Sequence, residues 1–383
     1  MRIDRINIYK IHLPFRMEFS ISQSRDPAAC ILVVEAISKE GEIKGFGEGI
    51  PVYSVTGETV ESTLDNIRAF SQKETFPWDL EDVSQIRDFV DSLPKGKENS
   101  AAISSLEVAL LDMLGKKEGK RITEYFPQDF YADRIHYGAI IPLGDESRLA
   151  GICNILKRMG IKVLRIKMGK DLEQNKRTLE MVRTSLGEHC DIRIDPNRIW
   201  TRQLALSHLP LIKENHVRVV EEPMLSDEFG FRELVDLIQS AGAIPMACES
   251  APTLSEVKRV IKEGYYQLVN VKLCRSGGFR RALQTIDFLR ANKVPFQIGC
   301  SLGESGILSA AGRALCLLCK DAVYYDGSYD KFLLGENTTL EHVSFGQGGM
   351  AGPLEGPGLG VKLDSRKLER LSGSIKTTIN NPN

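Results

Sequence analysis

Five charged residues recur at nearly even intervals in the second half of the chain. A lysine comes first, three carboxylates follow, and a second lysine ends the series: Lys167, Asp195, Glu221, Glu249 and Lys272. Successive members stand 28, 26, 28 and 23 residues apart. Each lies at the end of a short apolar segment of the kind that forms a buried parallel strand, where charges are not expected. A single charge at a strand end is commonly solvated or paired, but five at this spacing indicate one shared site.

The three carboxylates indicate a bound divalent cation. Unpaired carboxylates in one pocket repel one another and raise one another's pKa. A hard cation relieves that repulsion, and ligation by oxygen alone suits Mg²⁺, with Mn²⁺ as a substitute. The sequence therefore predicts a metal site among the carboxylates.

The two lysines indicate acid–base chemistry. A lysine near a metal and a second cation has a lowered pKa and acts as a base. Alternation along the strand points Arg165 into the same interior as Lys167, where it supplies that second cation. Removal of the proton beside a carboxylate leaves an enediolate, whose charge a metal stabilises. A lysine on each face of the substrate permits racemisation or epimerisation, whereas loss of a leaving group gives elimination or cycloisomerisation.

The elements that position these residues follow the pattern of a closed barrel. From about Tyr137, short apolar strands alternate with amphipathic helical stretches, with about 25 residues from one strand to the next. The strands centre on GAIIPL, KVLRIKM, DIRID, VRVVEEP, AIPMACE, QLVNVKL, PFQIGC and AVYYD. Eight such units predict an α/β fold with a parallel sheet closed into a TIM-like (β/α)8 barrel. The catalytic face of such a barrel lies at the carboxyl ends of its strands, where the five charges fall.

A smaller α+β region precedes the barrel. Three strand-like segments predict a meander at Met1–Leu13, Cys30–Ser38 and Lys44–Ile50. A helical pattern then runs from Val60 to Glu118 and stops at Gly119. We predict a capping domain over residues 1–130, a catalytic barrel over 131–335, and a C-terminal segment over 336–383 that returns to the capping domain.

Two polar loops of the capping domain are expected to close over the substrate. They span Glu18–Pro27 and Tyr53–Glu58 and are rich in polar residues and turn formers. Closure of such loops excludes water and sets specificity.

Composition excludes several classes of protein. The 383 residues are 42% hydrophobic and 26% charged, and 50 basic side chains nearly balance 51 acidic ones. A nucleic-acid or membrane-surface binder would show a basic excess. The chain has no apolar run of membrane-spanning length and no signal-peptide pattern, so we expect a cytoplasmic protein. The eight cysteines are expected to be reduced and buried, and Cys316 and Cys319 to pack in the core.

Five motifs in barrel order resemble the enolase superfamily, within it the muconate-lactonising and dipeptide-epimerase branch. They are GEGIPVYSVTGET (residues 47–59), LRIKMG, IRIDPNRIW, VVEEP and VNVKLCRSGG. The resemblance implies a (β/α)7β barrel with a capping domain, Lys167 and Lys272 as the acid–base pair, and Asp195 and Glu221 as metal ligands. It also implies a small-molecule carboxylate substrate and a homo-oligomer.

The sequence departs from this branch at the metal site. The first of two usual lysines is replaced by Arg165, which keeps the cation. The usual Asp-Glu-Ser is Cys248-Glu249-Ser250, and a soft thiolate is a poor ligand for Mg²⁺. Similarity to mandelate-racemase-like members assigns Glu249 as the third ligand instead.

Other departures concern the substrate. The segment PFQIGCSLGES has no histidine base, and Glu304 falls where members place a carboxylate near the substrate. Dipeptide epimerases hold the substrate ammonium with Asp-x-Asp. Here the stretch is Ser328-Tyr329-Asp330, with Asp326 nearby, which weakens a dipeptide specificity. Two further residues, Asn197 and Gln297, are candidates for supporting the ligands or the substrate from behind, and both are equally compatible with a structural role.

Three functions fit these observations. The first is proton transfer that epimerises a dipeptide or an N-acylated amino acid. The second is cycloisomerisation of the muconate type, or dehydration, of a small carboxylic acid. The third is a barrel that binds or scaffolds without catalysis, which Cys248 supports and the two retained lysines oppose, because buried ammonium groups are costly.

Overall fold

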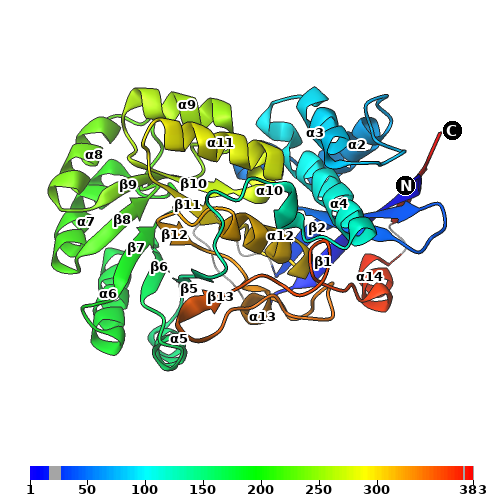
Figure 1. Cartoon of the computed structure of the whole chain (residues 1–383). Helices are drawn as coiled ribbons and strands as arrows, with labels where there is room; N and C mark the ends of the chain where they lie inside the picture. Colours follow the sequence, from blue (N-terminus) through cyan, green and yellow to red (C-terminus); the bar gives the residue numbers. More distant parts are fainter. Residues whose placement is uncertain (17–26, 374–375, 383) are drawn as a thin grey trace.

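An eight-stranded parallel sheet forms the larger part of the molecule (Figure 1). The computed structural model describes residues 1–16, 27–373 and 376–382. The strands follow one another in chain order, and each neighbouring pair is parallel. They are β5 (Ala139–Ile141), β6 (Val163–Lys167), β7 (Asp191–Asp195), β8 (Val217–Glu221), β9 (Ile244–Ala247), β10 (Leu268–Lys272), β11 (Phe296–Gly299) and β12 (Tyr324–Tyr325). All eight strands predicted from the sequence are confirmed.

The sheet curls until its last strand meets its first. The backbone N–H of Gly138, directly before β5, donates to the carbonyl of Tyr325 in β12 at 2.8 Å. Seven crossover helices join the strands within residues 139–325: α5 (Glu146–Arg158), α6 (Leu172–Leu186), α7 (Arg202–Glu214), α8 (Phe231–Ser240), α9 (Leu254–Glu263), α11 (Phe279–Ala291) and α12 (Gly306–Leu317). A single turn, α10 (Leu273–Ser276), follows β10, and another, α13 (Asp330–Leu333), follows β12. The arrangement is the (β/α)7β barrel that the resemblance implied.

Local sequence explains why these crossover helices begin where they do. Asp145, Asp171 and Thr201 each accept a hydrogen bond from the backbone N–H three residues later, at the starts of α5, α6 and α7. Such N-caps satisfy backbone donors that the helix itself leaves free. The helices then bury apolar residues at spacings of three and four, as in α8, and this stripe packs onto the barrel.

The capping region has an antiparallel sheet built from both ends of the chain. Its order is β14-β1-β2-β3, with β1 (Ile3–Pro14), β2 (Ala28–Ser38), β3 (Lys44–Gly49) and β14 (Lys376–Asn380). The predicted meander is confirmed. Because β14 pairs with β1, both termini lie at the capping end of the molecule (Figure 1). The domain boundaries at residues 130 and 335 stay predictions.

Helices cover one face of this sheet. They are α2 (Val60–Ser71), α3 (Val83–Ser92) and α4 (Ser100–Glu118), preceded by the single turn α1 (Tyr53–Thr56). The predicted stop of α4 at Gly119 is confirmed by its left-handed φ of 70°. Helix α4 lies against β3, where a Cβ at Gly47 would stand 1.9 Å from the carbonyl oxygen of Ser105. Only glycine permits this close approach of the helix.

The remaining elements are short. They are β4 (Ile135–His136) paired with β13 (Met350–Ala351), α14 (Ser365–Ser372), and 3-10 turns at Lys97–Asn99, Ile122–Tyr125 and Gln347–Gly349. Of the two loops predicted to close over the substrate, the first falls mostly in residues 17–26, outside the described residues. The second contains α1. No helix in the described part of the chain is long and apolar enough to cross a membrane.

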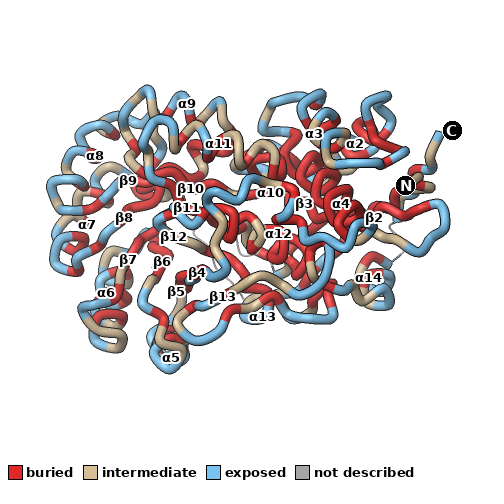
Figure 2. The backbone as a smooth tube through the Cα atoms, in the orientation of Figure 1, coloured by how far each residue is buried: buried red, intermediate tan, exposed pale blue. Residues whose placement is uncertain are grey.

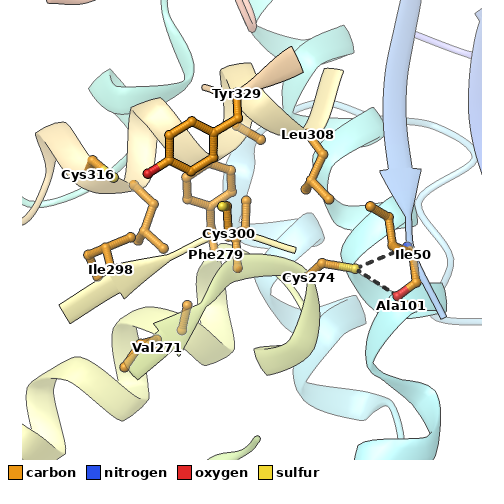
Figure 3. Packing of buried hydrophobic residues seen from close by; sticks show 14 of the residues in the cluster. Ile50, Ala101, Val271, Cys274, Phe279, Ile298, Cys300, Leu308, Cys316 and Tyr329 are labelled. Atoms are coloured by element: carbon orange, nitrogen blue, oxygen red, sulfur yellow. Dashed lines mark hydrogen bonds between the residues drawn. The ribbon is translucent and has the colours of Figure 1, made fainter. Parts of the chain in front are cut away.

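The barrel and the capping region each have a buried interior (Figure 2). Buried segments concentrate in the barrel strands and in α4, whereas the outer faces of the barrel helices are exposed. The eight cysteines are free; seven are buried and Cys30 is partly exposed, so the prediction is confirmed for seven of them. Cys274 bridges the two regions, because its sulfur accepts a hydrogen bond from the backbone N–H of Ile50 at 3.3 Å (Figure 3).

Two fully buried carboxyl groups hold the capping region onto the barrel. Glu48 of β3 accepts hydrogen bonds from the backbone N–H groups of Ser305 and Leu308, at 2.9 and 3.2 Å, where α12 begins. Glu107 of α4 accepts from the N–H of Arg280 at 2.9 Å, where α11 begins. Each carboxyl therefore caps a barrel helix from the other region. Burial raises the pKa of both groups to about 7.

This arrangement predicts a pH-dependent contribution to stability from Glu48. A carboxyl whose pKa is higher in the folded state stabilises the fold at low pH, and that stabilisation is lost as the pH rises through about 7. The loss corresponds to about 3 kcal/mol between pH 5 and pH 8. Glu48→Gln removes it, so urea unfolding should show the variant gaining stability relative to the wild type as the pH rises. Glu74→Gln, at an exposed position, is the control; parallel pH profiles for wild type and Glu48→Gln would contradict this expectation.

Candidate active site

The barrel brings the five charged residues of the sequence pattern to one end of the sheet. Lys167, Asp195, Glu221 and Lys272 are the last residues of β6, β7, β8 and β10, and Glu249 follows β9. In a ring of eight strands, β6 and β10 lie four positions apart and hence on opposite sides. The two lysines therefore flank the carboxylates.

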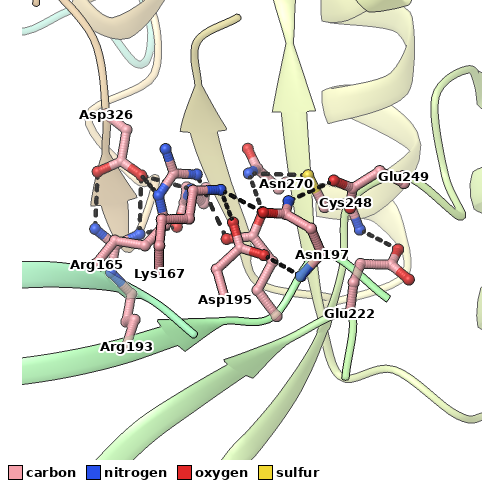
Figure 4. A network of polar contacts seen from close by, with 12 residues as sticks. Arg165, Lys167, Arg193, Asp195, Asn197, Glu222, Cys248, Glu249, Asn270 and Asp326 are labelled. Carbon is pink, nitrogen blue, oxygen red and sulfur yellow. Dashed lines mark hydrogen bonds and ion pairs between the residues drawn. The ribbon is translucent and has the colours of Figure 1, made fainter. Parts of the chain in front are cut away.

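Two of the three predicted metal ligands, Glu221 and Glu249, lie close together, and the sulfur of Cys248 lies beside them. Ligand atoms of Glu221, Cys248 and Glu249 all lie within 4.8 Å of one another. Asp195 is adjacent but outside this group, because its carboxylate binds the Lys167 ammonium at 2.5 Å (Figure 4). Asn197 links the two parts: it accepts from Lys167 at 2.9 Å and donates to Glu249 at 2.9 Å.

The three carboxyl groups differ in how readily they ionise. Burial and the neighbouring Glu221 raise the pKa of Asp195 to about 6. Burial also acts to raise the pKa of Glu221, but Arg165 and Lys272 outweigh it and lower that pKa to about 2. Lys272 and Arg275 act in the same way on Glu249, whose pKa is also about 2. Two ionised carboxylates beside a third that resists ionisation form a site suited to a divalent cation.

Lys167 and Lys272 differ in their surroundings. Lys167 is buried and held by Asp195 and Asn197, whereas Lys272 is half-buried and its ammonium makes no hydrogen bond or ion pair within the described residues. Burial lowers the pKa of Lys272, but the Cys248 sulfur and the Glu221 carboxylate raise it, and the net direction is upward. The lowering predicted for a lysine beside a bound metal stays a prediction.

A second polar layer lies one step below the charged strand ends. Strand alternation places residues two positions earlier on the same interior face: Arg165, Arg193, Asn270 and Gln297. Arg193 binds both oxygens of Asp326, at 2.8 and 3.2 Å, and donates to Gln297. Arg165 reaches Asp326 and Glu221, each at 3.4 Å (Figure 4). Asn270 donates to Glu221 at 3.0 Å. This layer fixes Glu221 from below.

Comparison with known proteins agrees with the fold. A family model described as enolase C-terminal domain-like matches residues 150–367, more than half of the chain.

The chain belongs to this family of the enolase superfamily.

Its relatives include racemases and epimerases. A hydrophobic dipeptide epimerase of Enterococcus faecalis is 24% identical over 82% of this chain and 87% of its own length. An N-succinyl-L-Arg/Lys racemase of Bacillus cereus is 25% identical over 82% of this chain and 83% of its own. The crystal structure of a Cytophaga hutchinsonii dipeptide epimerase, complexed with Mg and the dipeptide D-Ala-L-Val, superposes with a TM-score of 0.83 at 23% identity, covering 99% of this chain and all of that one.

The donor groups at this site of the enolase-superfamily chain suit a divalent cation, but one of the three does not suit Mg²⁺. Glu221 and Glu249 offer carboxylate oxygens, and Oε2 of Glu249 is buried without a hydrogen-bond partner among the described residues. The third donor within 4.8 Å is the sulfur of Cys248. Mg²⁺ takes oxygen ligands, so this sulfur does not suit it.

The two aspartates expected near the substrate ammonium are already bound by the protein. Asp326 is fully buried between the Arg165 and Arg193 guanidiniums. Asp330 is buried too, and it accepts from the Asn337 side chain and from the backbone N–H of Val343, at 2.5 and 3.0 Å. Asp326 is therefore fully occupied by protein partners, whereas Oδ1 of Asp330 is buried without a hydrogen-bond partner among the described residues. Gln297 belongs to the Asp326 network, to which it donates at 3.1 Å.

Glu304 is the carboxyl group that remains near the lysines. It is half-buried after β11 and accepts from the backbone N–H of Ser301 at 2.6 Å. Burial and the neighbouring Glu48 raise its pKa to about 8, although Lys272 acts to lower it. Near neutral pH, Glu304 is mostly protonated and can donate a hydrogen bond.

Sequence reasoning missed several groups that hold the site. Glu222 adopts a left-handed φ of 44° and accepts from the backbone N–H groups of Cys248 and Ser250, both at 2.7 Å. Its carbonyl accepts from the N–H of Arg198, itself at φ 63°, at 2.7 Å. These contacts tie together the segments after β7, β8 and β9. Alternation could have found Arg193 and Asn270; nothing in the sequence signals the Glu222 turn.

The buried Arg193–Asp326 pair should be essential for stability. Asp326→Asn removes the anion between two buried guanidiniums and should cost about 3–5 kcal/mol in urea unfolding. Arg290 and Asp321 form a matched pair, also with two contacts, at 2.8 and 2.9 Å, but partly exposed. Asp321→Asn should cost about 1 kcal/mol or less. Equal losses of unfolding free energy in the two variants would contradict the expectation that burial makes the Arg193–Asp326 pair contribute more to stability.

Proposed function

We propose that this chain is a racemase or epimerase that exchanges the proton on the carbon beside a substrate carboxylate, with Lys167 and Lys272 as its acid–base pair. The strand order carries the proposal. Lys167 on β6 and Lys272 on β10 lie on opposite sides of the ring, with the carboxylates of β7, β8 and the segment after β9 between them. A substrate held above these carboxylates would present one face to each lysine. Racemase and epimerase relatives support the assignment.

The contacts of the lysines support a two-base reaction. In one direction, Lys272 takes the α-proton, the substrate becomes an enediolate, and the Lys167 ammonium gives a proton to the opposite face. The reverse reaction exchanges the two roles. Asp195 and Asn197 hold the Lys167 ammonium in place for this transfer. A bound divalent cation supplies electrostatic stabilisation of the charge that develops on the substrate carboxylate.

We further propose an N-acylated amino acid, rather than a dipeptide with a free amine, as the substrate. A free ammonium needs an available carboxylate; Asp326 is committed to two guanidiniums, and Asp330 is held by protein groups through Oδ2, with its Oδ1 buried. Glu304, with its raised pKa, suits an amide carbonyl of an acyl group, because a protonated carboxyl donates a hydrogen bond. The segment around α1 would contact the distal part of such a substrate, and the contact of Arg198 with the carbonyl of Ser54 at 3.5 Å, which links this segment to the loop after β7, supports that role.

Deuterium exchange tests both proposals. The protein is incubated in D₂O with a pool of N-acyl amino acids, dipeptides with free amines, and small hydroxy and unsaturated acids. Mg²⁺, Mn²⁺, Co²⁺ and Zn²⁺ are supplied in separate reactions. Mass spectrometry should show deuterium at the α-carbon of N-acyl amino acids. Lys167→Ala and Lys272→Ala should each slow conversion between enantiomers at least about 100-fold.

The outcomes separate the alternatives. Lys170→Ala, at an exposed position in the segment after β6, is the control and should behave as the wild type. Exchange in dipeptides alone would overturn the N-acyl assignment and leave the lysine pair intact. Consumption of the hydroxy or unsaturated acids without exchange would point to dehydration or cycloisomerisation. No reaction with any cation would overturn the proposed activity and favour a binding role.

A further inference from the structure

The sulfur of Cys248 occupies a place where the carboxylates of the site converge. It lies within 4.8 Å of ligand oxygens of both Glu221 and Glu249. The residue is almost fully buried, with 1% of its surface exposed, so solvent-borne oxidants and electrophiles have little access to it. Its sulfur faces the same atoms that a cation in this site would bind.

The protein holds this sulfur as a hydrogen-bond acceptor. Arg275 donates to it at 3.3 Å and Asn270 at 3.5 Å (Figure 4 shows the Asn270 contact). The backbone of Cys248 is fixed as well, because its N–H donates to Glu222 at 2.7 Å. Burial raises the pKa of this thiol, although Arg275 acts to lower it, so the proton would be displaced by a coordinated cation.

We infer that Cys248 is a metal ligand and that, with Glu221 and Glu249, it makes this site select a thiophilic cation such as Zn²⁺ or Co²⁺ over Mg²⁺. The reason is ligand softness. Thiolate favours Zn²⁺ and related transition ions, whereas Mg²⁺ requires oxygen. Binding releases the thiol proton to solvent and forms a metal–sulfur bond.

The charges and free atoms of the site agree with this ligand set. Two carboxylates and a thiolate carry three negative charges, which a divalent cation together with Arg275 balances. Oε2 of Glu249 has no hydrogen-bond partner among the described residues, although it is buried, and so remains available for coordination. The inference does not depend on which reaction the chain catalyses.

Metal binding and spectroscopy test the inference without an activity assay. The protein is stripped with a chelator and each cation is added alone, with affinity measured by equilibrium dialysis. Co²⁺ and Zn²⁺ should bind at least about tenfold more tightly than Mg²⁺. The Co²⁺ form should show a near-ultraviolet sulfur-to-metal absorption band. X-ray absorption of the Zn²⁺ form should show one sulfur at about 2.3 Å.

Variants assign the signal to Cys248. Cys248→Ser should abolish the absorption band, and Cys248→Asp should abolish it and raise the affinity for Mg²⁺ at least tenfold. Cys30→Ser is the matched control, because Cys30 is the partly exposed thiol and lies 3.8 Å from His12, where adventitious metal would bind; its band should persist.

Two results would overturn the inference. The first is wild-type affinity for Mg²⁺ equal to that for Co²⁺, and the second is an X-ray absorption spectrum of the wild-type Zn²⁺ form with oxygen and nitrogen neighbours alone. The second measurement needs no variant, so it holds even where a substitution at Cys248 prevents folding. Because the readouts are structural, a failure here is distinct from a failure of the proposed racemase activity.

Discussion

The burial of two guanidinium groups inside the barrel is the constraint on which the site depends. Arg165 and Arg193 are buried inside the barrel, where an unpaired charge would cost several kcal/mol. Asp326 at the end of the sheet forms ion pairs with both, and Gln297 completes the network. Because Arg165 also contacts Glu221, this polar layer supports the floor of the site as well as the last strand of the barrel. Asp326, an expected substrate contact, is thereby held in structural ion pairs.

The segments above this floor are positioned by backbone geometry and by helix caps. Left-handed turns at Arg198 and Glu222 join the loops after β7 and β8, and Glu222 then orients the residues after β9. Such conformations are costly for residues other than glycine and persist where their surroundings enforce them. The carboxyls of Glu48 and Glu107 fix the capping region over the same end of the barrel. Rigid placement of the charged groups follows from these contacts.

Much of this arrangement could be predicted from the sequence, because it follows from two periodic patterns: the repeat of one strand and one helix, and the alternation of side chains along a strand. The spacing of one strand and one helix predicts eight strands and aligns Lys167, Asp195, Glu221 and Lys272 at their ends. The alternation along strands points Arg165 inward and would also have identified Arg193. The partner that each of these side chains contacts could not be predicted. Whether Asp326 meets a substrate or an arginine depends on contacts between distant strands, and the direction of the Cys248 sulfur depends on a left-handed turn at Glu222.

The central claim is that two lysines act on opposite faces of one carbon. It is tested most directly by following loss of the α-proton signal by NMR in D₂O, separately for each pure enantiomer of an accepted N-acyl amino acid. The account predicts that Lys167→Ala still exchanges the proton of one enantiomer and that Lys272→Ala exchanges only that of the other, because each variant keeps the base on one face. Exchange of the same enantiomer by both variants would contradict it.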